Sequence, residues 1–181
     1  MKKVLVFLAE GFEEIEALTP IDVLRRAGAE VTVAGVGGLT IRGSHSVSVV
    51  CDVAVEDVKG DFDCVICPGG MPGSVNLSAS WAVNELTIRT AANGGVVAAI
   101  CAAPAVVLGP AGLLDGHQAV CFPGMEKAYP EFTFANDRVL VSDNLITARA
   151  AGCAMDFALT IVRVLFGQKK NDSLSESLIV R

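Results

Sequence analysis

Residues 3–36 read KVLVFLAEGFEEIEALTPIDVLRRAGAEVTVAGV. The stretch opens with a near-continuous apolar run, which is typical of a strand covered on both faces. A helical pattern follows from about Glu13 to Ala27, and Gly28 is expected to end that helix. A second apolar segment at residues 30–36 predicts another strand. The stretch therefore predicts a strand–helix–strand unit at the start of the chain.

Strands and helices alternate along the rest of the chain. We expect further strands at residues 62–67, 95–100, 118–122, 138–142 and 145–149. We expect further helices at residues 80–92, 103–108 and 151–166, a hairpin or edge ribbon at residues 40–50, and a polar step with a docked tail in the last dozen residues. This alternation predicts an open α/β sandwich with a mostly parallel central sheet.

The composition narrows the class of protein. The chain has 181 residues, 52% of them hydrophobic, and carries a net charge of -6. The length predicts one domain over residues 1–181, and the apolar composition favours a sheet covered on both faces or a buried oligomer contact. Glycines and prolines interrupt the longest apolar segment, residues 94–114, so we expect no membrane-spanning helix. Because the lysines and arginines are scattered rather than clustered, we expect no nucleic-acid partner. The first apolar run is too short for a signal peptide, so we expect a cytoplasmic protein.

The sequence VVAAICAAP, residues 96–104, places Cys101 between a predicted strand and a predicted helix. Pro104 favours a helix that begins within the next turn. Ala99 and Ala103 are the small residues that a sharp strand-to-helix corner needs around its nucleophile. The start of a helix favours the thiolate, so we expect a lowered pKa for this thiol. Cys101 is therefore either a nucleophile on an elbow or a small buried residue in an alanine-rich turn.

Three glutamates, Glu13, Glu14 and Glu16, open the first predicted helix. At about 100° per residue, Glu16 falls on the apolar face, whereas Glu14 falls on the polar face near Arg25. We therefore expect Glu16 to be buried, and burial without a cation raises the pKa of a carboxyl group. A protonated Glu16 can donate a hydrogen bond to a thiolate or act as acid and base. For Glu13 and Glu14 we expect first-turn charges that complement the helix dipole.

The loop PGGMPG, residues 68–73, ends a buried strand at the same sheet edge as Cys101. Glycines let backbone N–H groups approach a ligand oxygen closely. Gly69 and Gly70 are therefore candidate oxyanion donors, although any tight turn can use the same residues.

The other cysteines and the histidines carry weaker signals. Without a secretory context, the six cysteines are expected to be thiols rather than disulfides. Cys64 and Cys67 have the spacing of a redox or zinc motif, but residues three apart on a strand point to opposite faces, so we expect neither function. Cys121 and Cys153 are expected to pack in the interior. His117 is expected at the surface, and a reach of His45 from the ribbon loop into the pocket is left open.

Four segments together resemble the ThiJ/PfpI superfamily, and within it the DJ-one branch. They are EGFEEIEALTPIDVLRRAG (10–28), CPGGMPGSVNLS (67–78), AAICAAP (98–104) and DFALTIVRVL (156–165). The resemblance spans almost the whole chain and implies a flavodoxin-like three-layer sandwich with a nucleophile elbow, usually a homodimer, with Cys51 similar to an interface cysteine. It identifies Cys101 as a reactive cysteine oxidisable to sulfinic acid and Glu16 as its protonated partner. It places Gly69 and Gly70 on the oxyanion side of the pocket.

Two pocket positions depart from the pattern of relatives. Ala102 follows the cysteine where protease-like members carry histidine, so we expect no peptidase activity. Phe122 precedes Pro123 where the DJ-one branch carries a pocket histidine. This departure leaves Glu16 as the evident proton carrier.

The resemblance implies two alternative functions. A third alternative is a purely structural role for the elbow. The first function is a cofactor-independent glyoxalase or deglycase that acts through Cys101 and Glu16 on methylglyoxal-type 2-oxoaldehydes or their glycated adducts. The second is a non-enzymatic redox sensor or redox-regulated chaperone that uses oxidation of Cys101. In the third reading the elbow has only packing value. No metal or other cofactor is expected for any of them.

Overall fold

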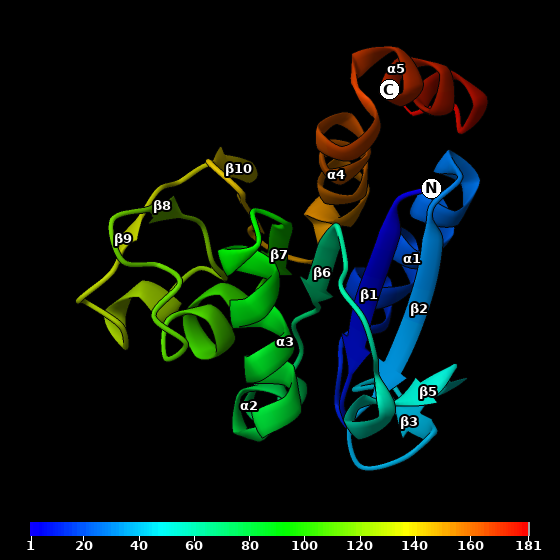
Figure 1. The fold of residues 1–181 in the computed structure, drawn as a ribbon. Helices are drawn as coiled ribbons and strands as arrows, with labels where there is room; N and C mark the ends of the chain where they lie inside the picture. Colours follow the sequence, from blue (N-terminus) through cyan, green and yellow to red (C-terminus); the bar gives the residue numbers. More distant parts are fainter. Residues whose placement is uncertain (181) are drawn as a thin grey trace.

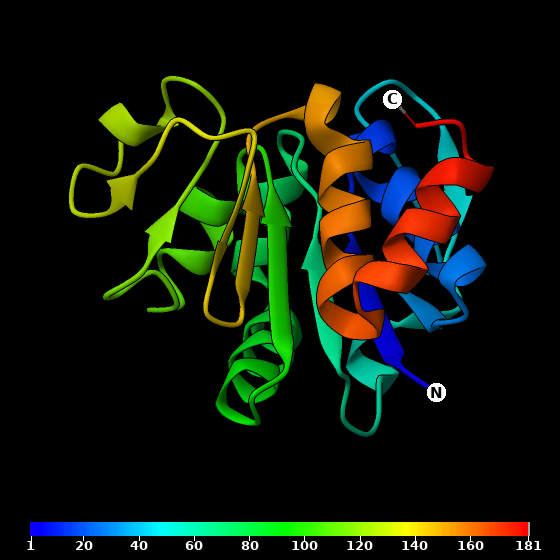
Figure 2. The same cartoon turned by 90° about the horizontal axis from the view of Figure 1, so that it is seen from above.

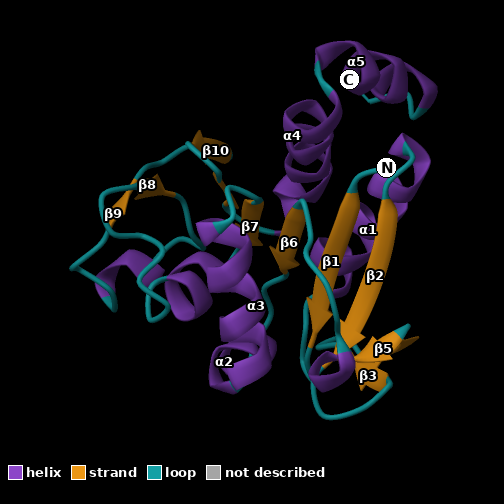
Figure 3. Ribbon diagram, viewed as in Figure 1, coloured by secondary structure: helices purple, strands orange, loops and turns teal. Residues whose placement is uncertain are grey.

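The computed structural model describes residues 1–180, and its centre is a seven-stranded sheet (Figure 1, Figure 3). The strands run in the order β10-β11-β7-β6-β1-β2-β5. Their bounds are β1 (Lys3–Leu8), β2 (Glu30–Gly35), β5 (Val53–Ala54), β6 (Cys64–Cys67), β7 (Val96–Ile100), β10 (Val139–Ser142) and β11 (Leu145–Ala148). Every neighbouring pair is parallel except β10 and β11. The predicted mostly parallel α/β sheet is confirmed.

Helices cover both faces of this sheet (Figure 2). On one face lie α1 (Glu14–Ala27), α4 (Ala154–Phe166) and α5 (Gln168–Ser177), and on the other lie α2 (Gly73–Ala79), α3 (Trp81–Ala92) and the π-helical turn η2 (Pro104–Leu108). Short 3-10 turns are η1 (Val55–Asp57), η3 (Met125–Lys127) and η4 (Ala151–Cys153). Val4 and Val6 of β1 pack against the first set, whereas Leu5 and Phe7 pack against the second. Burial on both faces explains why this strand reads as a continuous apolar run.

The predicted first unit is present as β1, α1 and β2. Gly28 ends α1 in the left-handed conformation, with φ 95°, and its N–H donates to the carbonyl of Arg25 at 3.1 Å. Glycine adopts this conformation without the steric cost that a Cβ would add. The predicted ribbon is also present as the antiparallel pair β3 (Thr40–Arg42) and β4 (Ser48–Val50).

The prediction was wrong for one strand and for one helix. Only Gln118–Ala119 forms a strand in the expected segment 118–122, and this β8 pairs with β9 (Thr133–Phe134) outside the central sheet. The reason is that β11 already pairs with β7, and the Val120 N–H bonds to the side-chain hydroxyl of Thr147 at 2.9 Å instead of to a strand. The segment at 103–108 forms a π-helical turn rather than the start of an ordinary helix.

Two helices carry no clear signal in the sequence. The helix α2 spans only seven residues, and α5 occupies the segment that was expected to be a polar step. Because Leu174 is the one buried side chain of α5, no apolar stripe marks this helix. Leu178 and Val180 pack against the core beside α1 and α4, as a docked tail requires. Within residues 1–180, no helix combines the length and apolar character needed to cross a bilayer.

Candidate active site

Cys101 follows β7 at the carboxyl edge of the sheet and has a left-handed backbone, with φ 65°. Its N–H donates to the carbonyl of Ala148 at 2.9 Å, and its own carbonyl accepts from Phe122 N–H at 2.7 Å. Ala99 and Ala103 are both fully buried where the chain reverses. A cysteine in this conformation stores strain of about 1–3 kcal/mol, which the surrounding hydrogen bonds must hold. The structure thus shows a sharp elbow with a half-buried thiol.

Glu16 lies on the buried face of α1, the helix that follows β1, and β1 is separated from the elbow strand β7 by β6. Its side chain is buried, with the residue 1% exposed, as the helical periodicity predicts. Oε2 accepts the Gly69 N–H at 2.9 Å, and Oε1 has no hydrogen-bond partner among the described residues. A Cβ at Gly69 would collide with Oε2 of Glu16 and with Cβ of Cys101. Glycine at position 69 therefore allows the carboxyl group and the cysteine to share one small space.

The two candidate oxyanion glycines have different roles. The Gly69 N–H holds Glu16 and is therefore not free for a substrate oxygen, which corrects the expectation for this residue. The Gly70 N–H faces the sulfur of Cys101, together with the N–H of Ala102. Gly70 has φ 91°, and a Cβ there would overlap the backbone of Glu13. The N–H groups available to a developing anion are thus those of Gly70 and Ala102.

Cys101 and Glu16 titrate as a pair. Burial raises the pKa of Glu16 to about 7, against the lowering influence of the nearby Cys101 thiol and of the Gly69 N–H. Burial, followed by the charge of Glu16, raises the pKa of Cys101 to about 12, against the N–H groups of Ala102 and Gly70. Because the influence of the carboxylate vanishes when Glu16 is protonated, the two groups titrate as one coupled pair, in which a charged Glu16 holds the remaining proton on the sulfur.

The prediction that the following helix lowers the pKa of Cys101 is wrong when Glu16 is charged. The helix after the elbow is a five-residue π-helical turn, Pro104–Leu108, so it provides only a short dipole. Burial and the nearby carboxylate together raise the pKa of Cys101 and are its largest causes. Activation of the thiol therefore depends on the protonation of Glu16 rather than on the helix.

The first glutamates of α1 also differ from expectation. Glu13 is the N-cap, and its carboxylate accepts the N–H of Ile15 at 3.3 Å. Glu14 is buried rather than on a solvated face, since the loop of the β3–β4 ribbon covers it. The carboxylate accepts the N–H of His45 at 2.7 Å. This bond and the other hydrogen bonds to the carboxylate lower the pKa of Glu14 to about 2 despite burial. Helical periodicity alone cannot show a ribbon that returns over the helix.

The histidines and Phe122 complete the residues singled out by the sequence. His45 contacts Glu13 and Glu14, and no contact joins it to Cys101 among the described residues. His117 lies 3.2 Å from the hydroxyl of Ser142 and is partly buried. Phe122 reaches the elbow through its backbone, and its side chain is 46% exposed. Phe122 therefore contacts the elbow through its backbone, and its ring carries no group that could offer a proton.

The other cysteines are buried, and all six are free thiols in the described chain. Cys64 and Cys67 pack into cores on opposite faces of the sheet, which confirms that they form no common site. Burial raises the pKa of Cys51 and of Cys121 to about 11. Cys101 is thus the one half-exposed thiol within residues 1–180.

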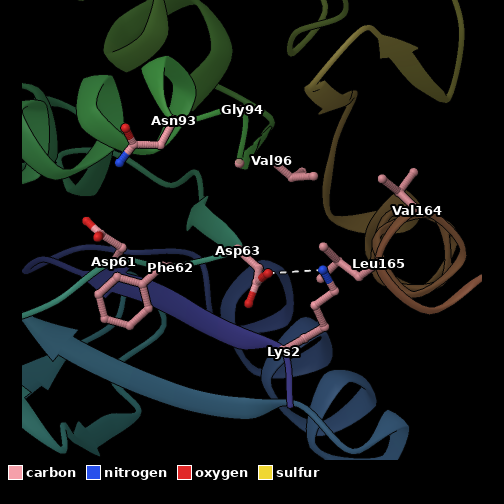
Figure 4. A pocket seen from close by; sticks show the side chains of 10 residues that line it. Lys2, Asp61, Phe62, Asp63, Asn93, Gly94, Val96, Val164 and Leu165 are labelled. Carbon is pink, nitrogen blue, oxygen red and sulfur yellow. Dashed lines mark hydrogen bonds and ion pairs between the residues drawn. The ribbon is translucent and has the colours of Figure 1, made fainter.

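A cavity of about 780 Å³ lies at the opposite edge of the sheet, before the strands begin (Figure 4). Its walls include the ion pair between Lys2 and Asp63, with Nζ and Oδ1 3.0 Å apart, and the apolar side chains of Val164 and Leu165. Neither Cys101 nor Glu16 lines this cavity. Although this cavity is large, it is therefore not the site of the reactive cysteine.

The fold and the elbow define a class of protein: an α/β sandwich that presents a strained cysteine beside a buried carboxyl group at the carboxyl edge of its sheet. The DJ-1/PfpI family model matches residues 2–164. The protein dj-1beta of Drosophila melanogaster is 40% identical, over 99% of this chain and 97% of that protein. The oxidised DJ-1 of Toxoplasma gondii superposes with a TM-score of 0.96 at 39% identity, over 99% of this chain and 98% of that one.

Two further relatives add to this comparison. The glutathione-independent glyoxalase DJR-1.2 of Caenorhabditis elegans is 35% identical, over 98% of this chain and 96% of that protein. The DJ-1 homolog B of Arabidopsis thaliana is 38% identical over 99% of this chain, which spans only 42% of the length of that relative. The chain belongs to the DJ-1/PfpI family, and the resemblance to the ThiJ/PfpI superfamily and its DJ-one branch is confirmed.

Proposed function

We propose that the protein is a glutathione-independent glyoxalase that converts methylglyoxal-type 2-oxoaldehydes to 2-hydroxy acids through Cys101 and Glu16. The observation that carries the proposal is Oε1 of Glu16, a buried carboxyl oxygen without a partner among the described residues, beside a half-exposed sulfur. A residue that moves protons needs such a free oxygen next to the reacting atoms. The glyoxalase relative from Caenorhabditis elegans supports the same chemistry.

The reaction begins from the minor form of the pair, in which the proton is on Glu16 and Cys101 is ionised. The sulfur bonds to the aldehyde carbon, and the aldehyde oxygen takes the proton of Glu16, which gives a hemithioacetal. The N–H groups of Gly70 and Ala102, which face the sulfur, donate to the oxygen while it carries negative charge. This step leaves Glu16 as a carboxylate beside the carbon that must next lose its hydrogen.

Glu16 then moves a proton between the two carbons. It removes the hydrogen of the former aldehyde carbon, and the electron pair of that C–H bond forms an enediolate. Glu16 returns the proton to the neighbouring carbon, and the hydroxyl proton passes to the second oxygen, which gives a lactoyl thioester. Water cleaves the C–S bond to release lactate. One of the two protons set free restores Glu16, the other enters the solvent, and Cys101 is again a thiolate.

Formation of lactate from methylglyoxal in the absence of glutathione tests the proposal. The wild-type protein should produce lactate well above the rate of the heat-denatured protein at the same concentration. A rate equal to that control would overturn the glyoxalase function.

The second candidate is a redox sensor or redox-regulated chaperone. A specific observation favours it: two N–H groups, those of Gly70 and Ala102, face the sulfur where sulfinate oxygens would accept them. Position 122 is phenylalanine rather than histidine, so the elbow also lacks, at this position, a base that catalytic turnover would use. After mild peroxide treatment, mass spectrometry should find two added oxygens on Cys101 before any other cysteine. Equal oxidation of the six cysteines would contradict this function.

We also propose a homodimer through the side of α1 that borders the β3–β4 ribbon. Ile15 is 55% exposed, Val47 is 48% exposed and Val50 is 74% exposed. The Val47 N–H donates to Glu14 at 3.3 Å, so Val47 lies near the first turn of α1, and Val50 lies on strand β4 of the same ribbon, paired with Thr40. Sedimentation should show a dimer for wild type and a monomer for Val50→Asp, because a charge in an apolar contact is costly. A wild-type monomer at micromolar concentration would contradict the dimer.

A further inference from the structure

A second cluster of reactive side chains lies where the loop of the β3–β4 ribbon covers the start of α1. Nδ1 of His45 is 3.2 Å from Oε2 of Glu13 and 3.1 Å from Oε2 of Glu14. Oγ of Ser44 is 3.3 Å from each of these carboxylate oxygens and 3.1 Å from Nδ1 of His45. Four polar atoms from two elements that are distant in the sequence therefore surround one point.

The spacing of these atoms matches the corners of a tetrahedral metal site. Ligands that lie 2.0–2.1 Å from zinc in a tetrahedron are about 3.3 Å apart. Five of the six distances between the four atoms are 3.1–3.3 Å, and the two carboxylate oxygens lie within 4.8 Å of each other. We propose that Glu13, Glu14 and His45 bind a zinc ion, with the Ser44 hydroxyl or a water molecule as the fourth ligand.

The surrounding backbone holds these ligands in place. Oε1 of Glu14 accepts the N–H groups of His45 at 2.7 Å and of Val47 at 3.3 Å, so Oε2 is left for the metal. A Cβ at Gly43 would occupy the position of the Glu14 carboxyl group. The Ser44 N–H donates to the carbonyl of Phe12 at 2.8 Å, which fixes the ribbon loop on α1. Hydrogen bonds of this kind orient the ligands of metal sites and contribute to affinity.

The charge and the exposure of the cluster also favour a divalent cation. Two carboxylates face one imidazole, so a proton on His45 offsets only one of the two negative charges. A zinc ion offsets both and binds the lone pair of Nδ1 after that nitrogen loses its proton. The side chain of His45 is 73% exposed in the single chain, so an ion can reach the cluster from solvent in the monomer. Imidazole and carboxylate are ligands that zinc accepts, and the site contains neither Cys101 nor Glu16.

Cobalt titration of the metal-free, full-length protein tests this proposal independently of activity. One equivalent of Co²⁺ should give the visible bands of tetrahedral cobalt without the near-ultraviolet band of a cobalt–thiolate bond, and Zn²⁺ should displace it. His45→Ala and Glu13→Gln should each weaken binding at least 10-fold. His117→Ala is the matched control, since His117 faces Ser142 and Asp143 elsewhere, and it should bind as wild type does.

Three results would overturn the zinc site: no saturable binding, a thiolate band with the first equivalent of cobalt, or unchanged affinity in His45→Ala. Because His45 is an exposed loop residue, its substitution should leave the fold intact, which circular dichroism checks. Ser44→Ala should change the affinity less than His45→Ala does, since water can take the fourth position. A larger loss in Ser44→Ala would contradict the assigned ligands.

Discussion

Replacing Cys101 by serine should lower kcat/KM for methylglyoxal by at least about 10³-fold. A hydroxyl group is far less ionised than a thiol, and the Glu16 carboxyl cannot supply the missing nucleophile. Cys101 is also the one half-exposed cysteine of the described chain, so no other thiol can replace it. Lactate measured at several methylglyoxal concentrations gives the ratio of wild type to variant.

The control for this substitution is Cys153→Ser. Cys153 is buried in the core that contains side chains of α1 and α4, so its thiol is closed to solvent, whereas that of Cys101 is half-exposed. This variant should keep the wild-type rate after correction for the folded fraction. A Cys101→Ser protein that turns over methylglyoxal as fast as Cys153→Ser would exclude Cys101 as the nucleophile.

Replacing Glu16 by glutamine should reduce kcat about 10²- to 10⁴-fold, the range typical of general acid–base catalysis. The amide keeps the volume of the side chain and can still accept the Gly69 N–H through its oxygen, but it cannot take or return a proton. Non-covalent binding of the aldehyde, before Cys101 attacks, does not need that proton transfer, so KM should change much less than kcat. Steady-state kinetics separates the two parameters.

Glu30→Gln serves as the control for Glu16→Gln. Glu30 begins β2 at the opposite edge of the sheet and is exposed. Its substitution should leave kcat unchanged. If Glu16→Gln keeps more than half of the wild-type kcat, then Glu16 is not the proton carrier and the mechanism fails at its second step.

Much of the fold follows from local sequence patterns. The continuous apolar runs of β1, β6 and β7, the helix ended by Gly28 and the alternating ribbon of β3 and β4 each carry a signal of their own. The failures occur where tertiary contacts decide the structure. Val120 bonds to Thr147 rather than extending a strand, and α5 has no apolar stripe because it buries only Leu174.

The candidate site divides in the same way. Periodicity places Glu16 on the buried face, and small residues around Cys101 predict the elbow, since both signals are local. The role of Gly69 cannot be predicted because its N–H is taken by a glutamate 53 residues away. The burial of Glu14 depends on a ribbon that folds back over α1. The titration of Cys101 likewise depends on a nearby charge that spacing does not reveal.

The account depends most on a neutral Glu16 that stabilises the thiolate of Cys101. The direct test is the rate of Cys101 alkylation as a function of pH, measured by mass spectrometry with EDTA present, for wild type and Glu16→Leu. Leucine removes the carboxyl proton and also the carboxylate charge. Below about pH 7, where Glu16 is protonated and donates to the sulfur, alkylation of Glu16→Leu should be slower than that of wild type. Above that pH the variant also lacks the carboxylate charge that raises the pKa of Cys101, so it should react faster than wild type. A variant that reacts as fast as wild type or faster below pH 7 would contradict the account.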